Sequence, residues 1–467
     1  MDKELLKKGK DILNALNANG FEAYLIGDIV KSTFANTFVL DAEVTTIAQI
    51  SDIKNIFVGH VDEEGENYVI VTIDNYKFKI TPFKNDPKVK PNPNSHYSKN
   101  LINDIALRDF TFNAIIMSHS GNIKDFYHGK SDIKFKTIRT INKPAKAIKK
   151  DPSIILKAFR YMAIDGFHMS SNLKSAIRTK AKLLKKADVG VIDEEMYHIY
   201  NAKGSFKAIR RMQRYGVCFY TGLYKKVLYD YSRRYKMLDY EDFLAMCFVL
   251  NEGIDERRIS HVTDIERFKK VYNVALTNPK CKFDILTMYS AGKDVLTRAW
   301  RINKLLKRTN VKLEKIMEEY DKLPIHKTCD LAFKGEDILA LCEGISAEKV
   351  LMLVDEVVFK VLNGELPNNR EQIKDFITDE IALNKDVEEV PIIKVEDIPE
   401  EIGKQVMTEL EEVSSTLSDS VSEIVNTCIK NLKDKQVLLE DDRVLEVRLR
   451  ALLMDYLESR GKKHGQN

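Results

Sequence analysis

The sequence has no long apolar segment. Its longest uninterrupted apolar run, from Phe243 to Leu250, is far shorter than the roughly 20 residues that a membrane-spanning helix needs. The first ten residues, MDKELLKKGK, also lack the apolar core of a signal peptide. These absences argue against a membrane or secreted protein, and we expect a cytoplasmic one.

Cysteine pairs and several common motifs are missing too. No CxxC pair occurs, which excludes a zinc ribbon, and the isolated cysteines give no disulfide framework. Walker A, GxGxxG and GxSxG motifs and His-Asp dipeptides are also absent, so P-loop, dinucleotide, serine-hydrolase and His-Asp phosphohydrolase sites are not encoded. We expect buried thiols at all six cysteines: Cys218, Cys247, Cys281, Cys329, Cys342 and Cys428.

Charge is unevenly distributed, although the formal net charge is only +4. Residues 134–186 contain 15 Lys and Arg against two Asp, and residues 204–236 contain nine against one. Aromatic residues interleave with the second block, a mixture that can neutralise phosphates and stack on unpaired bases. The alternative is an ordinary solvated surface with its aromatics in the core. The candidate RNA-binding residues are Lys182, Lys185, Lys186, Arg210, Arg211 and Arg214.

The hydrophobic periodicity divides the chain. Residues 1–20 have helical spacing, and short β-type runs follow at residues 23–26, 38–40, 68–73, 76–80 and 112–117, of which the third and fourth predict a hairpin. From about Lys146 to Ile381 the spacing is helical nearly throughout. Beyond Lys385, an acidic linker leads to a helix with one apolar stripe, which could fold back on the body or pair with a second copy or another protein.

Two carboxylates lie close to the first β-type run. Asp41 and Glu43 stand at i and i+2, so in a strand they would project to the same face, and Gly27 directly after the run would let a phosphate approach backbone amides. Such a carboxylate pair can hold two magnesium ions for nucleotidyl transfer. A D-x-E pattern alone also fits an exposed turn.

Further motifs follow in order. Gly27, Val30, Asp41, Glu43 and Thr46 fall at the spacing of GGxVRDxLLG and DxDxxT, and the sequence thereby resembles the class II tRNA nucleotidyltransferase and bacterial poly(A) polymerase family. Four later segments extend the resemblance to about residue 380. Residues 104–114 are similar to DLxRRDFTxNA, residues 125–139 to DPxGGxxDL…IR, residues 151–167 to EDxxRxLRAxRF…GF, and residues 323–368 to LPI…GxLxN.

The resemblance implies an α+β fold. We expect a nucleotidyltransferase (polymerase-beta-like) head at 1–145, an all-helical neck at 146–240, a body at 241–384, and a linker with a helical C-terminal extension at 385–467. It also implies Mg²⁺ as cofactor, CTP and ATP as substrates, and tRNA as partner. Asp41 and Glu43 would be the catalytic metal ligands. The nucleotide-binding residues would be Gly27, Asp28, Lys31, Arg108, Asp109, Asp151, Lys157 and Arg160.

Several positions depart from the family pattern. Asp28 replaces the second glycine, and its charge would oppose a triphosphate. Lys31 and Ser32 replace the arginine and aspartate of VRD, and Lys lacks the bidentate fork of Arg. Lys79 and Lys84 replace an acidic residue and an arginine in and after the hairpin. Leu107 and Ile154 replace arginines of RRDFT and EDxxR, and the helix at 193–196 lacks a third arginine.

These observations leave three hypotheses. The first is a CCA-adding or poly(A)-polymerase-like enzyme that extends RNA 3′ ends, in which Arg108 and Asp109 position the nucleotide and Asp151 reads the base. The second is an inactive or weakly active paralogue that is retained as an RNA-binding or interaction module. The third is a transferase with relaxed nucleotide choice.

Overall fold

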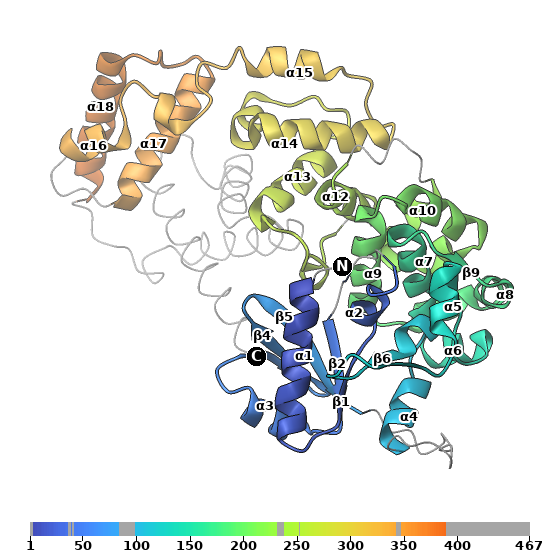
Figure 1. Cartoon of the computed structure of the whole chain (residues 1–467). Helices are drawn as coiled ribbons and strands as arrows, with labels where there is room; N and C mark the ends of the chain where they lie inside the picture. The colour runs from blue at the N-terminus through green and yellow to red at the C-terminus, as the bar shows by residue number, and fades with distance from the viewer. Residues whose placement is uncertain are drawn as a thin grey trace, which may run out of the picture. The chain divides into compact units, whose positions relative to one another are not determined.

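The chain folds into a sheet-containing head followed by helices (Figure 1). The computed structural model describes residues 3–35, 39, 42–83, 99–230, 238–251, 253–341 and 347–388. The chain divides into two compact units, Met1–Lys322 and Leu323–Asn467. The sheet-containing head followed by helices confirms the predicted α+β fold class. The apolar stripe expected beyond residue 400 lies outside the described residues.

The head contains a mixed sheet of seven strands. Their order is β3-β4-β5-β2-β1-β6-β7, in which β2 and β5 are parallel and all other neighbours are antiparallel. The strands are β1 (Ala23–Ile26), β2 (Ala42–Thr46), β3 (Val61–Gly65), β4 (Tyr68–Ile73), β5 (Tyr76–Pro82), β6 (Ile115–Met117) and β7 (Ile123–Asp125).

The head contains some of the strands that its sequence predicts, but not all of them. The strand at 23–26 is confirmed, and so is the hairpin, since β4 and β5 pair around Asp74 and Asn75. Both turn residues have positive φ (49° and 69°), as a tight two-residue hairpin turn requires. The expected strand at 112–117 is wrong in its first half, because Thr111–Ala114 forms a 3₁₀ turn. Of the run at 38–40, only Val39 is described, and it lies outside any strand.

The two faces of the sheet have different characters. Leu25, Val44, Ile80 and Val69 are register neighbours across four strands, and all are fully buried. Helix α1 (Lys3–Ala18) packs on the sheet and belongs to the same hydrophobic core. Because side chains alternate along a strand, Glu43 belongs to the opposite face.

Short helices connect the strands, and further helices form the rest of the first unit. In and next to the head are α2 (Asp28–Lys31), α3 (Ile50–Ile56), α4 (Lys99–Ala106) and α5 (Gly129–Lys134), followed by the small parallel pair β8 (Thr137–Ile138) and β9 (His168–Met169). The helical part comprises α6 (Pro144–Lys150), α7 (Ile154–Ile164), α8 (Ser171–Lys180), α9 (Val189–Asn201), α10 (Ser205–Arg214), α11 (Lys225–Tyr229), α12 (Tyr240–Asn251), α13 (Ile265–Thr277), α14 (Ile285–Leu305) and α15 (Leu313–Tyr320).

The described part of the second unit contains α16 (Gly335–Leu341), α17 (Ala347–Leu362) and α18 (Arg370–Glu388). Helix α18 continues past residue 384, so the acidic stretch expected to form a linker begins in helical conformation, and its remainder lies outside the described residues.

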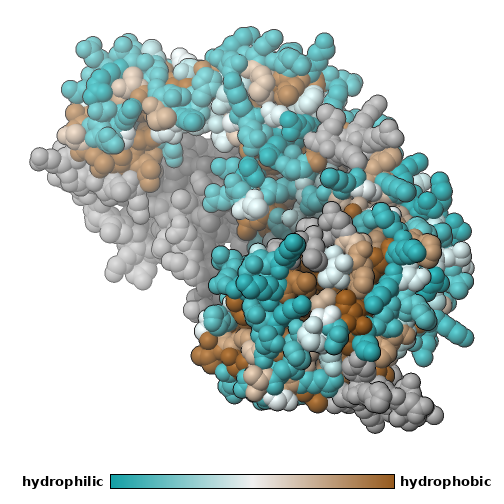
Figure 2. All heavy atoms as spheres, viewed as in Figure 1, coloured by the Kyte–Doolittle hydropathy of each residue, from teal (hydrophilic) through white to brown (hydrophobic). Residues whose placement is uncertain are grey.

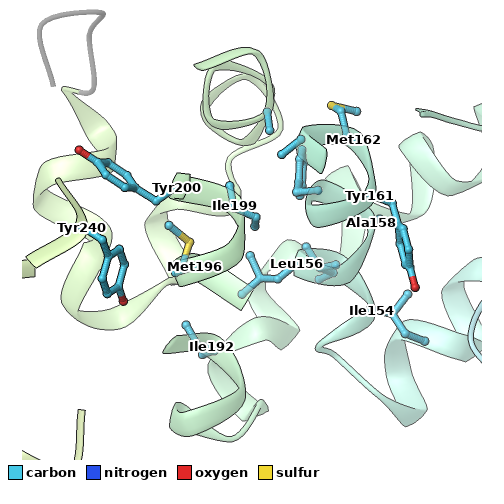
Figure 3. Packing of buried hydrophobic residues seen from close by; sticks show 14 of the residues in the cluster. Ile154, Leu156, Ala158, Tyr161, Met162, Ile192, Met196, Ile199, Tyr200 and Tyr240 are labelled. Atoms are coloured by element: carbon cyan, nitrogen blue, oxygen red, sulfur yellow. The ribbon is translucent and has the colours of Figure 1, made fainter. Parts of the chain in front are cut away.

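Helices α7 and α9 pack through an apolar interface (Figure 3). Leu156 from α7 and Met196 and Ile199 from α9 are fully buried there. Ile154, at the first position of α7, is also buried. The position at which the family pattern has a template arginine therefore belongs to the hydrophobic core.

The cysteines were predicted to be buried. Cys218, Cys247 and Cys281 are, but Cys329 is exposed, because it lies in a 3₁₀ turn (Thr328–Asp330) that has no buried residue. Cys342 and Cys428 lie outside the described residues. Among the helices that the structure describes, none combines the length and apolar character needed to span a bilayer.

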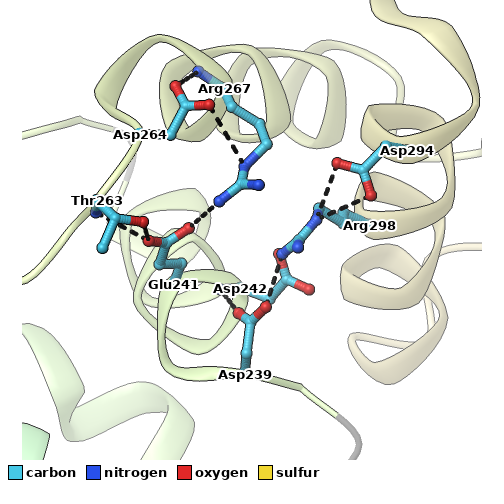
Figure 4. A network of polar contacts seen from close by, with 8 residues as sticks. All are labelled: Asp239, Glu241, Asp242, Thr263, Asp264, Arg267, Asp294 and Arg298. Carbon is cyan, nitrogen blue, oxygen red and sulfur yellow. Dashed lines mark hydrogen bonds and ion pairs between the residues drawn. The ribbon is translucent and has the colours of Figure 1, made fainter.

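A polar network joins α12, α13 and α14 (Figure 4). Arg298 donates to Asp239 and Asp242 at 2.7 and 2.9 Å and to Asp294 at 3.2 Å. The other carboxylate oxygen of Asp242 is buried without a hydrogen-bond partner. Burial and the charge of Asp239 raise the pKa of Asp242 to about 6, despite the opposing effect of Arg298.

The unfolding free energy should therefore contain a component that falls as pH rises. Because the folded-state pKa of Asp242, about 6, exceeds its ordinary value of 3.8, the folded protein holds this proton more tightly than the unfolded chain does. The stabilisation is present in full below the unfolded pKa and is lost as pH rises through about 6. An Asp242→Asn variant lacks this component.

We expect the unfolding free energy of the parent minus that of Asp242→Asn to decrease by about 2 kcal/mol between about pH 4 and pH 7. Urea denaturation at several pH values measures this difference. A difference that stays constant or increases with pH would contradict the assignment.

Candidate nucleotide site and basic surface

Glu43 stands beside the turn that ends β1. It is the register neighbour of Ile26, and Gly27 follows with φ 77° and ψ −141°, a conformation that other residues rarely adopt. A Cβ on Gly27 would lie 3.5 Å from Glu43 Oε2. Glycine therefore keeps open the space in front of this carboxylate. Asp41, the other candidate catalytic residue, lies outside the described residues.

Arg108 neutralises Glu43. Its Nη1 donates to Glu43 Oε2 at 2.5 Å, and its Nη2 lies 3.3 Å from Oδ2 of the fully buried Asp104. Thr45 also donates to Asp104 Oδ2, at 2.9 Å. Burial alone would lower the pKa of Arg108, but Asp104 and Glu43 outweigh it and raise this pKa. The guanidinium is thus a permanent cation at the position where the resemblance implies a metal.

The described residues do not by themselves fit a pair of magnesium ions. Among them, no group of three or more His, Cys, Asp or Glu side chains could hold a metal ion. The described carboxylate of the predicted pair is already paired with Arg108. Its register neighbour on β5 is Lys79, whose ammonium lies 4.5 Å from the centroid of the Tyr68 ring.

Lys31 and Asp28 form part of a buried ion cluster. Lys31 Nζ lies 2.7 Å from Asp28 Oδ1 and 2.8 Å from Asp165 Oδ2, and all three side chains are at most 8% exposed. The same ammonium lies 4.4 Å from the centroid of the Tyr161 ring, and the Tyr161 hydroxyl donates to Asp28 at 3.3 Å. The charge of Asp28 is therefore compensated internally, and Lys31 is not exposed for contact with a triphosphate.

Arg160 is likewise held inside the protein. Its guanidinium lies 4.4 Å from the Tyr161 ring centroid, and its Nε donates to Glu195 on α9 at 2.9 Å. Both side chains of this ion pair are at most 10% exposed. Tyr161 therefore has a cation from the head and a cation from the neck close to its ring, an arrangement that is attractive in a desolvated site.

Asp151 and Lys157 are more accessible. Lys157 Nζ lies 3.1 Å from Asp151 Oδ2, with side-chain exposures of 27% and 43%. Burial raises the pKa of Asp151, but Lys157 and Ser153 outweigh it, so this pKa lies below its ordinary value. Burial lowers the pKa of Lys157, but Asp109, Asp151 and Glu195 together raise it. Five of the predicted residues, Glu43, Arg108, Asp109, Asp151 and Lys157, thus keep solvent-accessible surface.

Two partners in these clusters escaped the sequence reasoning. Neither Asp165 nor Asp104 was among the candidate site residues. No local pattern distinguishes Asp165 from a surface carboxylate, and Asp104 begins the motif at 104–114 without a role assigned to it. Asp165 reaches Lys31 across 134 residues of chain. The helix at 193–196 was noted for its lost arginine, yet its carboxylates are paired: Asp193 with Arg258 and Glu195 with Arg160. Only the tertiary fold reveals these pairs.

The basic surface is assembled from two segments. Lys182, Lys185 and Lys186 are exposed on a 3₁₀ turn (Ala181–Lys186), which contacts a second 3₁₀ turn (Val217–Tyr220) that follows α10. On α10, Arg210 and Arg214 are exposed, whereas Arg211 is half-buried beside Tyr215. The visible surface over α8 and α10 is mostly hydrophilic (Figure 2).

The aromatic residues of this region divide between core and surface. Tyr215 and Tyr224 are buried, as the alternative of an ordinary solvated surface predicted, while Phe219 and Tyr229 are exposed. Tyr231 and Tyr235 lie outside the described residues.

Comparison with known proteins agrees with the sequence resemblance. Residues 23–139 match the poly(A) polymerase head domain, and residues 259–377 match the putative tRNA nucleotidyltransferase domain 2. The CCA-adding enzyme of Bacillus subtilis is 25% identical over 400 residues, which cover 81% of this chain and 98% of that protein. The CCA-adding enzyme of Bacillus licheniformis is 26% identical over 396 residues, which cover 80% and 98%.

Solved structures show the same fold. The CCA-adding enzyme of Bacillus stearothermophilus in complex with CTP has a TM-score of 0.58 at 22% identity, covering 83% of this chain and 100% of that chain. A CCA-adding enzyme in complex with ATP has a TM-score of 0.51 at 16% identity, covering 83% and 95%.

Replacing Lys31 by Met should destabilise the protein by about 3–5 kcal/mol, because the carboxylates of Asp28 and Asp165 would remain buried without their cation. Urea denaturation of the full-length protein measures this loss. Lys180→Met, at an exposed lysine of α8, is the matched control and should change the unfolding free energy by at most about 0.5 kcal/mol.

A triple variant, Lys31→Met with Asp28→Asn and Asp165→Asn, removes all three charges of this cluster and should recover much of the lost stability. If the single and the triple variant lose the same unfolding free energy relative to the parent, the destabilisation comes from packing and not from uncompensated charge.

Proposed function

We propose, on the premise that the chain belongs to the class II tRNA nucleotidyltransferase and bacterial poly(A) polymerase family, that this protein binds tRNA and adds nucleotides from CTP and ATP to its 3′ end. The observation that carries the proposal is the accessible set of polar side chains around Glu43 and Asp151. Curated CCA-adding enzymes are similar over almost their whole length, which supports the same substrate class.

The accessible side chains suit a nucleotide. The guanidinium of Arg108 is a planar fork of donors of the kind that matches phosphate oxygens. Its two terminal nitrogens pair with Glu43 and Asp104, so a phosphate would bind by replacing one of these carboxylates. The pKa of Asp151 is lowered, so its carboxylate is ionised at neutral pH and can accept a hydrogen bond from the exocyclic amino group of cytosine or adenine. Ile154 offers no donor to either base, so we expect weak discrimination between CTP and ATP.

The proposed organisation keeps the sequence division into a head at 1–145, a neck at 146–240 and a body at 241–384. Lys182, Lys185, Lys186, Arg210, Arg211 and Arg214 would contact the RNA backbone. The family resemblance implies magnesium as a cofactor, but the described residues do not form a magnesium site. The proposal therefore rests on nucleotide binding by this chain's own side chains. Cytoplasmic localisation and pairing through the C-terminal extension remain predictions.

A second candidate is an RNA-binding protein that no longer transfers nucleotides. The ion pair between Arg108 and Glu43 favours it, because a cation already occupies the carboxylate that would bind metal. The burial of Lys31 favours it too, since that residue stands where the family pattern has an arginine.

Incubation of the full-length protein with tRNA lacking its 3′ CCA, magnesium and each labelled nucleoside triphosphate distinguishes the two. We expect incorporation of C and A but not of U or G, resolved at single-nucleotide length. An Asp41→Ala variant should reduce the rate by at least about 100-fold, because even indirect partners of metal ligands contribute 10–100-fold. Glu66→Ala, at an exposed carboxylate of the head, is the control.

Unchanged activity in Asp41→Ala would show that the metal-pair assignment is wrong. No incorporation by the parent, together with tRNA binding that weakens as salt rises, would establish the second candidate instead.

A further inference from the structure

A groove lies on the neck between α10, the following 3₁₀ turn and the end of α11. It encloses about 460 Å³ and is lined by Arg210, Gln213, Arg214, Cys218, Phe219 and Tyr229. None of these described lining residues is acidic. Its residues belong to the first unit, and none of them is a candidate for the nucleotide site in the head.

The walls of the groove are fixed by the backbone. Gly216, with φ 71° and ψ 12°, ends α10 and turns the chain into the segment that carries Phe219. Gln213 Nε2 donates to the carbonyl oxygens of Leu228 and Tyr229 at 2.7 and 3.1 Å, which ties the end of α11 to α10. The two aromatic residues are therefore held on well-defined backbone and not on a loose loop.

Two aromatic rings face the solvent at this groove. Phe219 is 46% exposed and Tyr229 is 67% exposed, and their ring centroids are 5.6 Å apart at an interplanar angle of 53°. Other aromatic residues of the same region, Tyr215 and Tyr224, are buried. Since burying a ring is favourable, a pair left exposed together provides apolar surface for a planar ligand.

Two arginines place positive charge around these rings. Arg210 and Arg214 are both exposed, and Arg210 donates to the neutral amide oxygen of Gln213 at 2.7 Å. Cys218 forms part of the lining, and burial raises the pKa of its thiol to about 12, so it adds no negative charge at neutral pH. The groove thus combines apolar rings with two cations, which suits a planar base attached to a phosphate.

We propose that this groove binds an unpaired nucleotide of the RNA, with the base on Phe219 and Tyr229 and a backbone phosphate at Arg210 and Arg214. The proposal rests on the RNA binding proposed above and adds a single-stranded contact to it. The contact uses none of the residues that would select the incoming nucleotide. It gives the neck a preference for RNA with unstacked bases over a continuous duplex.

Ring removal tests the proposal. Full-length parent, Tyr229→Ala and Phe219→Ala are titrated against a short fluorescein-labelled single-stranded RNA and a blunt RNA duplex of the same length. We expect each variant to bind the single strand about 5- to 100-fold more weakly, as expected for loss of one base stack. Affinity for the duplex should stay unchanged. Tyr229→Phe keeps the ring and should bind like the parent.

Loss of an arginine should change a different quantity, the salt dependence of binding. Arg214→Gln should reduce the slope of log affinity against log salt concentration for the single strand by about 0.7, as expected for one lost phosphate contact. Both rings and Arg214 are exposed, so thermal unfolding should be the same in all variants.

The outcomes separate this proposal from the proposed function. Parent-like binding of single-stranded RNA by both alanine variants overturns the groove assignment, while nucleotide addition to tRNA in parallel assays still stands. Equal weakening for the duplex and the single strand overturns it too. Displacement of the single strand by free CTP as effectively as by RNA would identify a mononucleotide site instead. A parent that binds neither RNA overturns both proposals.

Discussion

The buried ammonium of Lys31 is the contact on which the junction of head and neck depends. It lies between Asp28 at the start of α2 and Asp165 directly after α7, so one lysine joins the sheet to the first long helix of the neck. Buried carboxylates are costly unless a cation and hydrogen bonds compensate them. The cluster therefore fixes the orientation of α7, and with it the positions of Lys157 and Asp151. The accessible part of the site is built on this buried part.

This buried arrangement explains several departures from the family pattern. Asp28, Lys31, Ser32 and Ile154 are all buried, and each has a local role in the fold. The extra acid at 28 is paired with the lysine at 31, the Ser32 hydroxyl donates to the carbonyl oxygen of Ile29, and Ile154 belongs to the hydrophobic core. Groups that resembled an eroded binding surface are integrated into the interior. Glu43, Arg108, Asp109, Asp151 and Lys157, by contrast, keep solvent-accessible surface.

Local features of the fold could be predicted from the sequence, because they depend on neighbouring residues. The strand at 23–26 and the hairpin around Asp74 follow from alternation and turn chemistry, and both are present. The ion pairs could not be predicted. Arg108 reaches Glu43 across 65 residues and Lys31 reaches Asp165 across 134, and no periodicity carries that information. The motif placed Arg108 near a nucleotide, but not against the carboxylate meant for a metal.

The position of Asp165 also bears on the order in which the protein can fold during synthesis. The sequence motifs end the head near residue 145, yet the second carboxylate of its buried lysine is supplied 20 residues later. Until α7 has left the ribosome, the nascent head holds Lys31 against Asp28 alone. At about 5–20 residues per second, this interval lasts on the order of a second or more. The smallest fragment that contains all partners of Lys31 is therefore longer than the domain that the sequence motifs delimit. A truncation at the motif boundary would separate this buried cation from one of its two carboxylate partners.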